Sequence, residues 1–460
     1  MLLAAIQGLA LVPLQAQAPA IQNNLGAHHY SVNASPEAQR YFDQGLRLFW
    51  GFNHAEAIRA FREGERVDST CAMCAFGIAL ALGPNINAPM TNAAADTAVA
   101  AVRRAQWRAT DSAEADLIGA LAARYTTADS TQRLRLDSAY AKALRRVVAG
   151  APRNLEARAF YADALMNLSP WNYWNADGSP RPGTRTILAQ LDTILKANPD
   201  HPGGCHLYIH AVEARFPARA VRCAERLAAL MPGAGHIVHM PAHIYIRVGR
   251  YAEAVEANQH ALHADHATLE GPGVLKRGVY AAGYYPHNHH FLSFAAAMMG
   301  NSKLAIEHAF HAAEGVDADV AANLPWVEAI TPIGYWTLVT FGQWDRLLTE
   351  PAPPPEQRFT TGMSFYARGV AFAAKHRWAE ANAALDSVGR IASVFPSGDN
   401  KTALLIAERA LAGEIDMRRD ALSSAIRSFQ SAVLLEDAMA YSEPPVWYYP
   451  MRHSLGKALI

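Results

Sequence analysis

The stretch Tyr251-Ala-Glu-Ala-Val-Glu-Ala-Asn-Gln-His-Ala-Leu follows a Gly-Arg turn at Gly249 and decides the fold. Ala220 lies 34 residues before Ala254 and holds the same position in the preceding unit, which ends at Pro232. A helix, a short turn, a second helix and a terminal proline with this period are typical of stacked helix pairs. Strand signals are scarce, so the sequence predicts an all-α solenoid.

Other segments repeat the same pattern of small and aromatic residues. The matching positions are Gly45, Ala57 and Phe61, then Gly300 and Ala305, then Gly369 and Ala381, and finally Ala425, Phe429 and Ala432. Small residues let paired helices approach closely, and aromatic residues fill the gaps between units. Over most of residues 36–460 the chain resembles tetratricopeptide-repeat (TPR) proteins. The resemblance implies a right-handed superhelical solenoid of TPR-like helix hairpins, an architecture that serves many functions.

Three segments carry a second resemblance, to a group of exported bacterial TPR proteins without an established activity. These segments are Gly83-Pro-Asn-Ile-Asn, His239-Met-Pro-Ala-His and Trp447-Tyr-Tyr-Pro-Met-Arg-His. The resemblance implies export, and it implies no reaction or substrate.

The sequence of the N-terminus also predicts export. Residues 1–18 are mostly apolar and end in Ala16-Gln-Ala, as in a secretory signal segment, and residues 19–35 form a linker. No Lys or Arg precedes the apolar stretch, so cleavage stays open. We expect a bacterial protein that is secreted, periplasmic or held at the cell surface. Cys71 and Cys74 lie three apart in a predicted helix, a spacing that favours packing over a disulfide.

Composition excludes several classes. Lys plus Arg and Asp plus Glu both number 41, and no basic cluster is present, so nucleic acid is not an expected partner. No apolar run after the signal segment is long enough to span a membrane.

Insertions interrupt the repeats near residues 169–184, 264–290 and 349–358. Trp171, Tyr173 and Trp174 in the first insertion are candidates for stacking on a sugar or peptide, or for covering a helix edge. Near Ile460 the sequence stops one helix into what looks like a new unit. Either the sequence is truncated or an open end stacks on another copy, which would give a homo-oligomer or filament.

Histidines cluster in the middle of the chain at helical spacing. His206, His210 and Glu213 stand at i, i+4 and i+7, and each such set shares one helix face. A second helix carries its imidazoles at i, i+3 and i+7, and a third group follows; they are His236, His239 and His243, then His287, His289 and His290. The repeat register places these positions on first helices of three neighbouring units, facing the concave groove in the proteins that this chain resembles.

This register predicts a transition-metal site for zinc, copper or iron, since imidazole is the commonest protein ligand for such ions. The candidate ligands are His206, His210, Glu213, His239, His243 and His290. We expect His236, His287 and His289 to line the groove beside them.

Several interpretations of the cluster stay open. The first is a metal site, held either by an exported scaffold that binds a protein partner in its groove or by a metal-dependent hydrolase or oxidase, with Glu213 as ligand or general base. The second is a groove that binds peptide or glycan through neutral imidazoles and aromatic residues. The third is helix packing and capping. The remaining histidines lack a shared register and are expected to be surface or structural residues, among them His28, His29, His54, His308 and His311.

Overall fold

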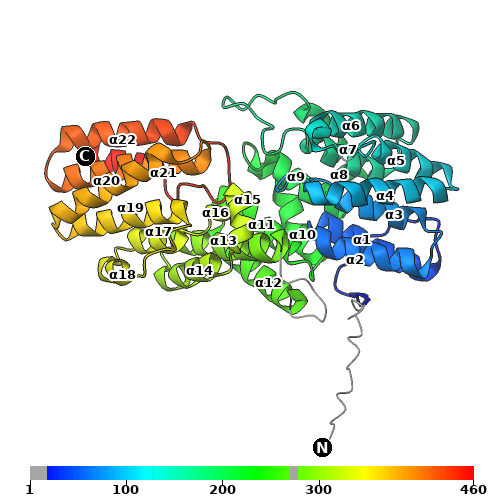
Figure 1. Cartoon of the computed structure of the whole chain (residues 1–460), viewed down its shortest axis with the longest axis horizontal. Helices are drawn as coiled ribbons and strands as arrows, with labels where there is room; N and C mark the ends of the chain where they lie inside the picture. The colour runs from blue at the N-terminus through cyan, green and yellow to red at the C-terminus, as the bar shows by residue number, and fades with distance from the viewer. Residues whose placement is uncertain (1–17, 128, 270–277) are drawn as a thin grey trace, which may run out of the picture.

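The computed structural model describes residues 18–127, 129–269 and 278–460. The N-terminal helices lie towards one end of the long axis of the molecule, and the C-terminal helices lie towards the other (Figure 1). No strand occurs in these ranges, and extended pairing is limited to the isolated bridges Asn85–Ala88 and Trp174–Pro180. The expectation of an all-α solenoid of helix hairpins is therefore confirmed.

The helices fall into three consecutive stretches. The first comprises α1 (Pro36–Trp50), α2 (His54–Val67), α3 (Ala72–Ala81), α4 (Asn92–Arg108), α5 (Ser112–Ala122), the 3-10 turn η1 (Ser130–Gln132), α6 (Arg133–Gly150), α7 (Leu155–Met166) and α8 (Thr184–Ala197). The second comprises α9 (Pro202–Val212), the 3-10 turn η2 (Pro217–Ala220), α10 (Val221–Leu230), α11 (Gly235–Arg247), α12 (Tyr251–Leu269), the π-helical turn η3 (Tyr280–Tyr284), α13 (Tyr285–Met298) and α14 (Ser302–Glu314). The third comprises α15 (Ala318–Asn323), α16 (Pro325–Glu328), α17 (Ile333–Thr340), α18 (Trp344–Thr349), α19 (Arg358–Ala374), α20 (Trp378–Val394), α21 (Asp399–Arg418), α22 (Leu422–Asp437) and α23 (Met451–Leu459).

Glycines allow neighbouring helices to close on large side chains. Phe61 on α2 is wedged between two of them: a Cβ added at Gly45 on α1 or at Gly77 on α3 would lie 2.5 Å from its ring. Gly413 on α21 and Phe429 on α22 repeat the arrangement near the other end of the solenoid, again at 2.5 Å. The repeated glycine and phenylalanine of the sequence are thus a steric requirement of helix pairing.

The first helix also packs against a helix far along the chain. A Cβ at Gly203 of α9 would lie 2.4 Å from the ring of Trp50, at the end of α1. The Trp50 indole donates a hydrogen bond to Glu156 Oε1 on α7 at 2.7 Å. This close approach holds the end of α1 against α9, which carries two of the central histidines.

A buried carboxylate fixes the helices on the other side of the cluster. Asp265 on α12 accepts hydrogen bonds from the Tyr280 hydroxyl at 2.7 Å and from Asn288 Nδ2 at 2.9 Å. The Tyr280 oxygen in turn accepts from the backbone N–H of His236 at 3.2 Å. A Cβ at Gly235 would lie 2.1 Å from this carboxyl group, so the start of α11 needs glycine.

The apolar interior forms two clusters of buried side chains. One runs from Leu25 to Ala295, and the other from Ala309 to Ala458. The histidine helices α9, α11 and α13 belong to the first. Residues 440–446, between α22 and α23, pass from the second cluster towards these helices.

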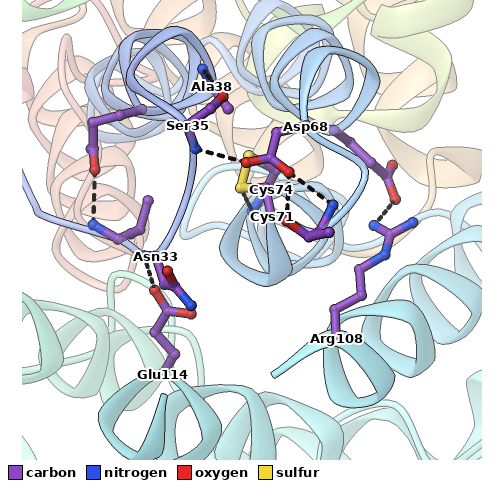
Figure 2. The surroundings of a disulfide bond; sticks show 12 residues. Asn33, Ser35, Ala38, Asp68, Cys71, Cys74, Arg108 and Glu114 are labelled. Atoms are coloured by element: carbon purple, nitrogen blue, oxygen red, sulfur yellow. Dashed lines mark hydrogen bonds and ion pairs between the residues drawn. A yellow bond between two sulfur atoms is a disulfide. The ribbon is translucent and has the colours of Figure 1, made fainter. Parts of the chain in front are cut away.

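The expectation for Cys71 and Cys74 is wrong, because the two residues form a disulfide (Figure 2). Cys71 is the extended N-cap of α3, not part of the helix, and its Cα lies 5.4 Å from that of Cys74. Asp68, just upstream, accepts from the backbone N–H of Ser35 at 2.7 Å. The connection between α2 and α3 is therefore tied both to the start of α1 and to its own helix.

Parts of the predicted organisation lie outside the described residues. These are positions 1–17 of the signal-like segment and positions 270–277 of the second insertion. None of the helices in the described part of the chain is long and apolar enough to cross a membrane.

The glycine contacts predict opposite effects of one substitution at two helical sites. Gly45→Ala should lower the free energy of unfolding by about 1–3 kcal/mol, because its Cβ overlaps the Phe61 ring. Gly119→Ala on α5 is the matched control: its Cβ meets no atom within 4 Å, so higher helix propensity should stabilise it by up to about 1 kcal/mol. Denaturant unfolding measures both, and equal effects would contradict this packing.

The disulfide predicts how many cysteines an alkylating reagent can label before reduction. Alkylation of denatured, unreduced protein should label Cys205 and Cys223, the buried free cysteines, and should leave Cys71 and Cys74 unmodified until a reductant is added. Peptide mass spectrometry gives the answer. Four labelled cysteines before reduction would contradict the pairing.

Candidate metal centre

Three helices of neighbouring units present histidines to one another. Helix α9 carries His206 and His210 one turn apart, and α11 carries His236, His239 and His243 along one face. Each of these five side chains is at most 2% exposed. Helix α13, entered through the π-helical turn η3, adds histidines from a third direction. Helical spacing fixes the face of each helix, and the packing of the units brings those faces together.

The hydrogen bonds of the α9 histidines determine which ring nitrogen carries the proton. His206 Nδ1 lies 2.6 Å from the Trp50 carbonyl oxygen, and His210 Nδ1 lies 3.0 Å from Glu213 Oε1. Both partners are acceptors, so both neutral rings carry their proton on Nδ1. The two Nε2 atoms, 3.1 Å apart, then face each other with lone pairs. A cation shared by these atoms would relieve the repulsion between them.

His239 and His243 of α11 also have an acceptor near Nδ1. His239 Nδ1 lies 2.7 Å from Asn258 Oδ1, and Asn258 Nδ2 donates to the Ala254 carbonyl, which fixes the orientation of the amide. His243 Nδ1 lies 2.9 Å from Glu213 Oε2. Among the described residues, neither His239 Nε2 nor His243 Nε2 has a hydrogen-bond partner. Metal-binding histidines are oriented in this way by acceptors on the opposite ring nitrogen.

His236 is a buried histidine whose ring makes no hydrogen bond within the described ranges. Within the part of the chain that the structure covers, neither of its ring nitrogens has a hydrogen-bond partner, although the residue is 1% exposed. Its ring packs between Phe52, with centroids 5.4 Å apart, and Tyr284, with centroids 4.5 Å apart. Leaving a buried polar group unpaired costs about 1–3 kcal/mol, so this position favours a ligand on His236.

The side chains form two triads and a shared carboxylate. In each triad one nitrogen per residue lies within 4.8 Å of the other two; the triads are His206, His210 and His236, and His239, His243 and His287. Glu213 is close to one member of each triad, His210 and His243, and is 0% exposed.

Burial dominates the electrostatics of the imidazoles. It holds the pKa of His206, His236, His239 and His287 well below the usual value, and neighbouring histidines lower those pKa values further. These rings are neutral at neutral pH, the state in which imidazole binds a metal ion.

His243 differs from the other imidazoles because two carboxylates approach it. Burial alone would lower its pKa, but Glu213 and Glu443 raise it to about 9. Glu443 Oε2 lies 3.3 Å from His243 Nδ1, and Glu443 Oε1 lies 3.3 Å from Arg247 Nε. Burial and the charge of Glu213 raise the pKa of Glu443 to about 7.

A cavity of about 450 Å³ adjoins the cluster. Its lining includes His210, His236, His243, His287, His290 and Glu443. Aromatic side chains form part of the wall, and Asn87 holds three of them: its Oδ1 accepts from Trp171, its carbonyl from Trp326, and its Nδ2 donates to the Tyr284 hydroxyl. A second cavity, of about 740 Å³, shares His290, Tyr441 and Glu443 with the first.

The remaining predicted site residues lie in different places. Trp171 lines the cavity, whereas Tyr173 is buried and the Trp174 indole donates to the Ala211 carbonyl at 2.8 Å. His290 lines both cavities, and burial lowers its pKa to about 3. His289 turns to another group, with its Nδ1 2.7 Å from that of His308.

Two further groups contain metal-ligand residue types. His289, His308 and His311 on α13 and α14 form a surface triad, in which His311 is exposed. His28 and His201 flank Glu156 Oε2 at 3.0 and 3.3 Å. His201 Nδ1 accepts from the Gly204 N–H, so the neutral ring carries its proton on Nε2, which faces Glu156. That proton blocks the lone pair, so His201 offers no nitrogen to a metal ion in the second group.

Among known proteins, solved structures of low sequence identity resemble this chain. No protein-family model matches the chain, and the search of curated proteins gave no match. The human IFIT1 dimer with m7Gppp-AAAA is 13% identical and covers 88% of this chain and 91% of its own, with a TM-score of 0.40. The Pyrococcus horikoshii STAND protein with a tetratricopeptide repeat sensor is 14% identical, covering 87% and 54%, with a TM-score of 0.39. The APC/C hetero-tetramer Cut9–Hcn1 is 13% identical, covering 95% and 79%, with a TM-score of 0.34.

The buried imidazoles predict how the metal-free protein responds to acid. A histidine with a depressed pKa binds its proton in the unfolded chain first, so stability is present above pH 6.5 and is lost as pH falls below it. His236→Phe should remove one such proton, and the slope of unfolding free energy against pH should become shallower by up to about 1.4 kcal/mol per pH unit. Denaturant unfolding at pH 5–7 measures this slope.

The exposed His453 provides the matched control. His453→Phe makes the same change at a side chain that is exposed in the folded protein. A His236→Phe slope equal to that of the starting protein would contradict the burial of a neutral imidazole.

Proposed function

We propose that this protein binds a transition-metal ion through its interior histidines and acts as a metal-dependent enzyme on a small molecule in the adjoining cavity. The pair of Nε2 atoms of His206 and His210 carries the proposal. They lie 3.1 Å apart, and the acceptors at both Nδ1 atoms leave two lone pairs between them. A metal ion is the partner that neutral imidazoles bind through such lone pairs.

The donor set favours zinc, copper or iron. Imidazole nitrogen suits these ions, whereas magnesium and calcium prefer oxygen ligands. Trp50, Glu213 and Asn258 supply the acceptors that orient the rings. A bound ion with an open position polarises a substrate oxygen or lowers the pKa of a bound water, which is compatible with a hydrolase or an oxidase.

The shape of the site supports a small substrate. A cavity of about 450 Å³ is within the usual range for small-molecule sites, and Trp171, Tyr284 and Trp326 contribute aromatic surface to its wall. Glu213 lies behind His210 and His243, away from the cavity lining, whereas Glu443 is part of that lining. We therefore assign proton transfer at the cavity wall to Glu443 instead of Glu213.

Partner binding is a second candidate function. The larger cavity, about 740 Å³, is lined by Trp336, Trp447 and Tyr448 among others, and such aromatic surfaces suit a peptide side chain or a glycan. Stacking of copies into a homo-oligomer or filament stays a prediction, which light scattering of native protein tests.

Export also stays part of the proposal. The signal-like segment supports it, and so does the Cys71–Cys74 disulfide, because such bonds persist in oxidising compartments. Cell fractionation tests it, and recovery of the native protein from the cytoplasm would contradict it.

Elemental analysis of the purified native protein tests the metal. We expect stoichiometric zinc, copper or iron, and a lower metal content in the double variant His239→Ala/His243→Ala. Asn258→Ala should weaken binding by about 10–100-fold, because His239 loses its orienting acceptor, and Asn258→Asp should retain binding since it keeps an acceptor oxygen.

The matched control for the double variant is His308→Ala/His311→Ala, which removes two histidines from the surface triad and leaves the interior intact. Absence of metal from the starting protein, or an unchanged metal content in His239→Ala/His243→Ala, would reject the interior site.

A further inference from the structure

We propose that the interior cluster is a dinuclear centre. It would hold one ion on His206, His210 and His236 and a second on His239, His243 and His287. The proposal rests on the proposed metal-binding function and goes beyond it in the number of ions, in their separate ligand sets and in the type of ligand that they take together.

The two ligand sets share no residue. In each, one nitrogen per imidazole lies within 4.8 Å of the other two. Metal–imidazole bonds of about 2.0–2.1 Å place two nitrogens of one ion at most about 4.2 Å apart, so each triad needs only a modest contraction to close on an ion. Three histidines with one open position are an established arrangement for a catalytic ion.

One ion cannot satisfy the nitrogens that the protein leaves unpaired. The lone pairs of His206 and His210 face each other, and His236, His239 and His243 present nitrogens without hydrogen-bond partners within the described ranges. A single ion bound by three histidines would leave at least two of these five buried residues without a partner for an unpaired ring nitrogen. Two ions, one on each triad, would take one nitrogen from each of these five residues.

The triads lie next to each other. The ring centroids of His210 and His243 are 5.3 Å apart, and those of His236 and His239 are 5.9 Å apart. Separations within a triad cover the same range, from 4.8 Å between His239 and His243 to 6.5 Å between His210 and His236. Because centroid distances between the triads are similar to those within them, the arrangement is compatible with the separation of about 3.5–4 Å between ions in two-metal sites.

Glu213 links the two ligand sets. Its Oε1 lies 3.0 Å from His210 Nδ1, and its Oε2 lies 2.9 Å from His243 Nδ1. An ion placed on His210, Glu213 and His243 would have to displace these contacts, and it would leave His236 and His239 unpaired. We therefore assign Glu213 as a positioning residue that orients one ligand of each triad.

Members of both triads face the same cavity. His210 and His236 belong to the first and His243 and His287 to the second, and all four line it. Two ions at this wall would take a ligand whose oxygen atom, or pair of oxygen atoms, bridges them. The centre is thus suited to small molecules that carry a carboxylate, phosphate, phenolate or similar oxygen donor.

A metal titration counts the ions, provided that the surface triad is removed first. The full chain with His308→Ala/His311→Ala is freed of metal and titrated with Zn²⁺ alone, and we expect two ions per chain. Adding His206→Ala/His236→Ala should leave one ion, and adding His239→Ala/His287→Ala instead should also leave one. All four substitutions together should leave none.

The outcomes separate the two proposals. No bound ion in the surface-triad variant would overturn both. One ion would leave the metal-binding function standing and overturn the dinuclear centre. Two ions that persist in all the triad variants would place them elsewhere and overturn both assignments.

Electron paramagnetic resonance provides a readout that does not depend on the folding of the triad variants. The surface-triad variant loaded with two equivalents of Cu²⁺ should show magnetic coupling between the ions, seen as a loss or broadening of the signal of isolated copper. Two equivalents that give only isolated, uncoupled copper would overturn the dinuclear centre.

Discussion

The hydrogen bonds of the buried Asp265 carboxylate hold the central helices in place. The carboxylate joins α12 to Tyr280 and Asn288, and Tyr280 reaches the first residues of α11. Burial raises the pKa of Asp265 to about 7, which measures how strongly this environment opposes a charge. The group is retained there because each of its oxygens has a donor, and the spacing between α11 and α13 follows from it.

Much of the fold is predictable because the repeat is a steric pattern. A small residue at Gly45 and an aromatic ring at Phe61 require each other across a helix pair, and that requirement is visible in the sequence as a fixed spacing. The disulfide was not predictable in the same way. Its formation depends on Cys71 being an extended N-cap residue, and helix boundaries shift by one or two positions without changing the periodic pattern.

Some residues of the candidate site could also be predicted from local spacing, and others could not. Helical spacing groups His206 with His210 and His239 with His243, because neighbours on one helix face are set by local geometry. Asn258 and Glu443 could not be found from spacing, since they come from a second helix and from a loop about 200 residues later. The partner of His289 could not be found from spacing either. His289 contacts His308 because α13 packs on α14, and the two residues share no helical spacing in the sequence.

The order of these residues along the chain has a consequence for biosynthesis. All six triad histidines precede residue 288, whereas Asp399, Tyr441 and Glu443, which form part of the cavity wall, follow more than a hundred residues later. A chain made from its N-terminus would present complete ligand sets while that side of the cavity is still open to solvent. The C-terminal segment would therefore add its part of the cavity wall to histidine helices that have already been made.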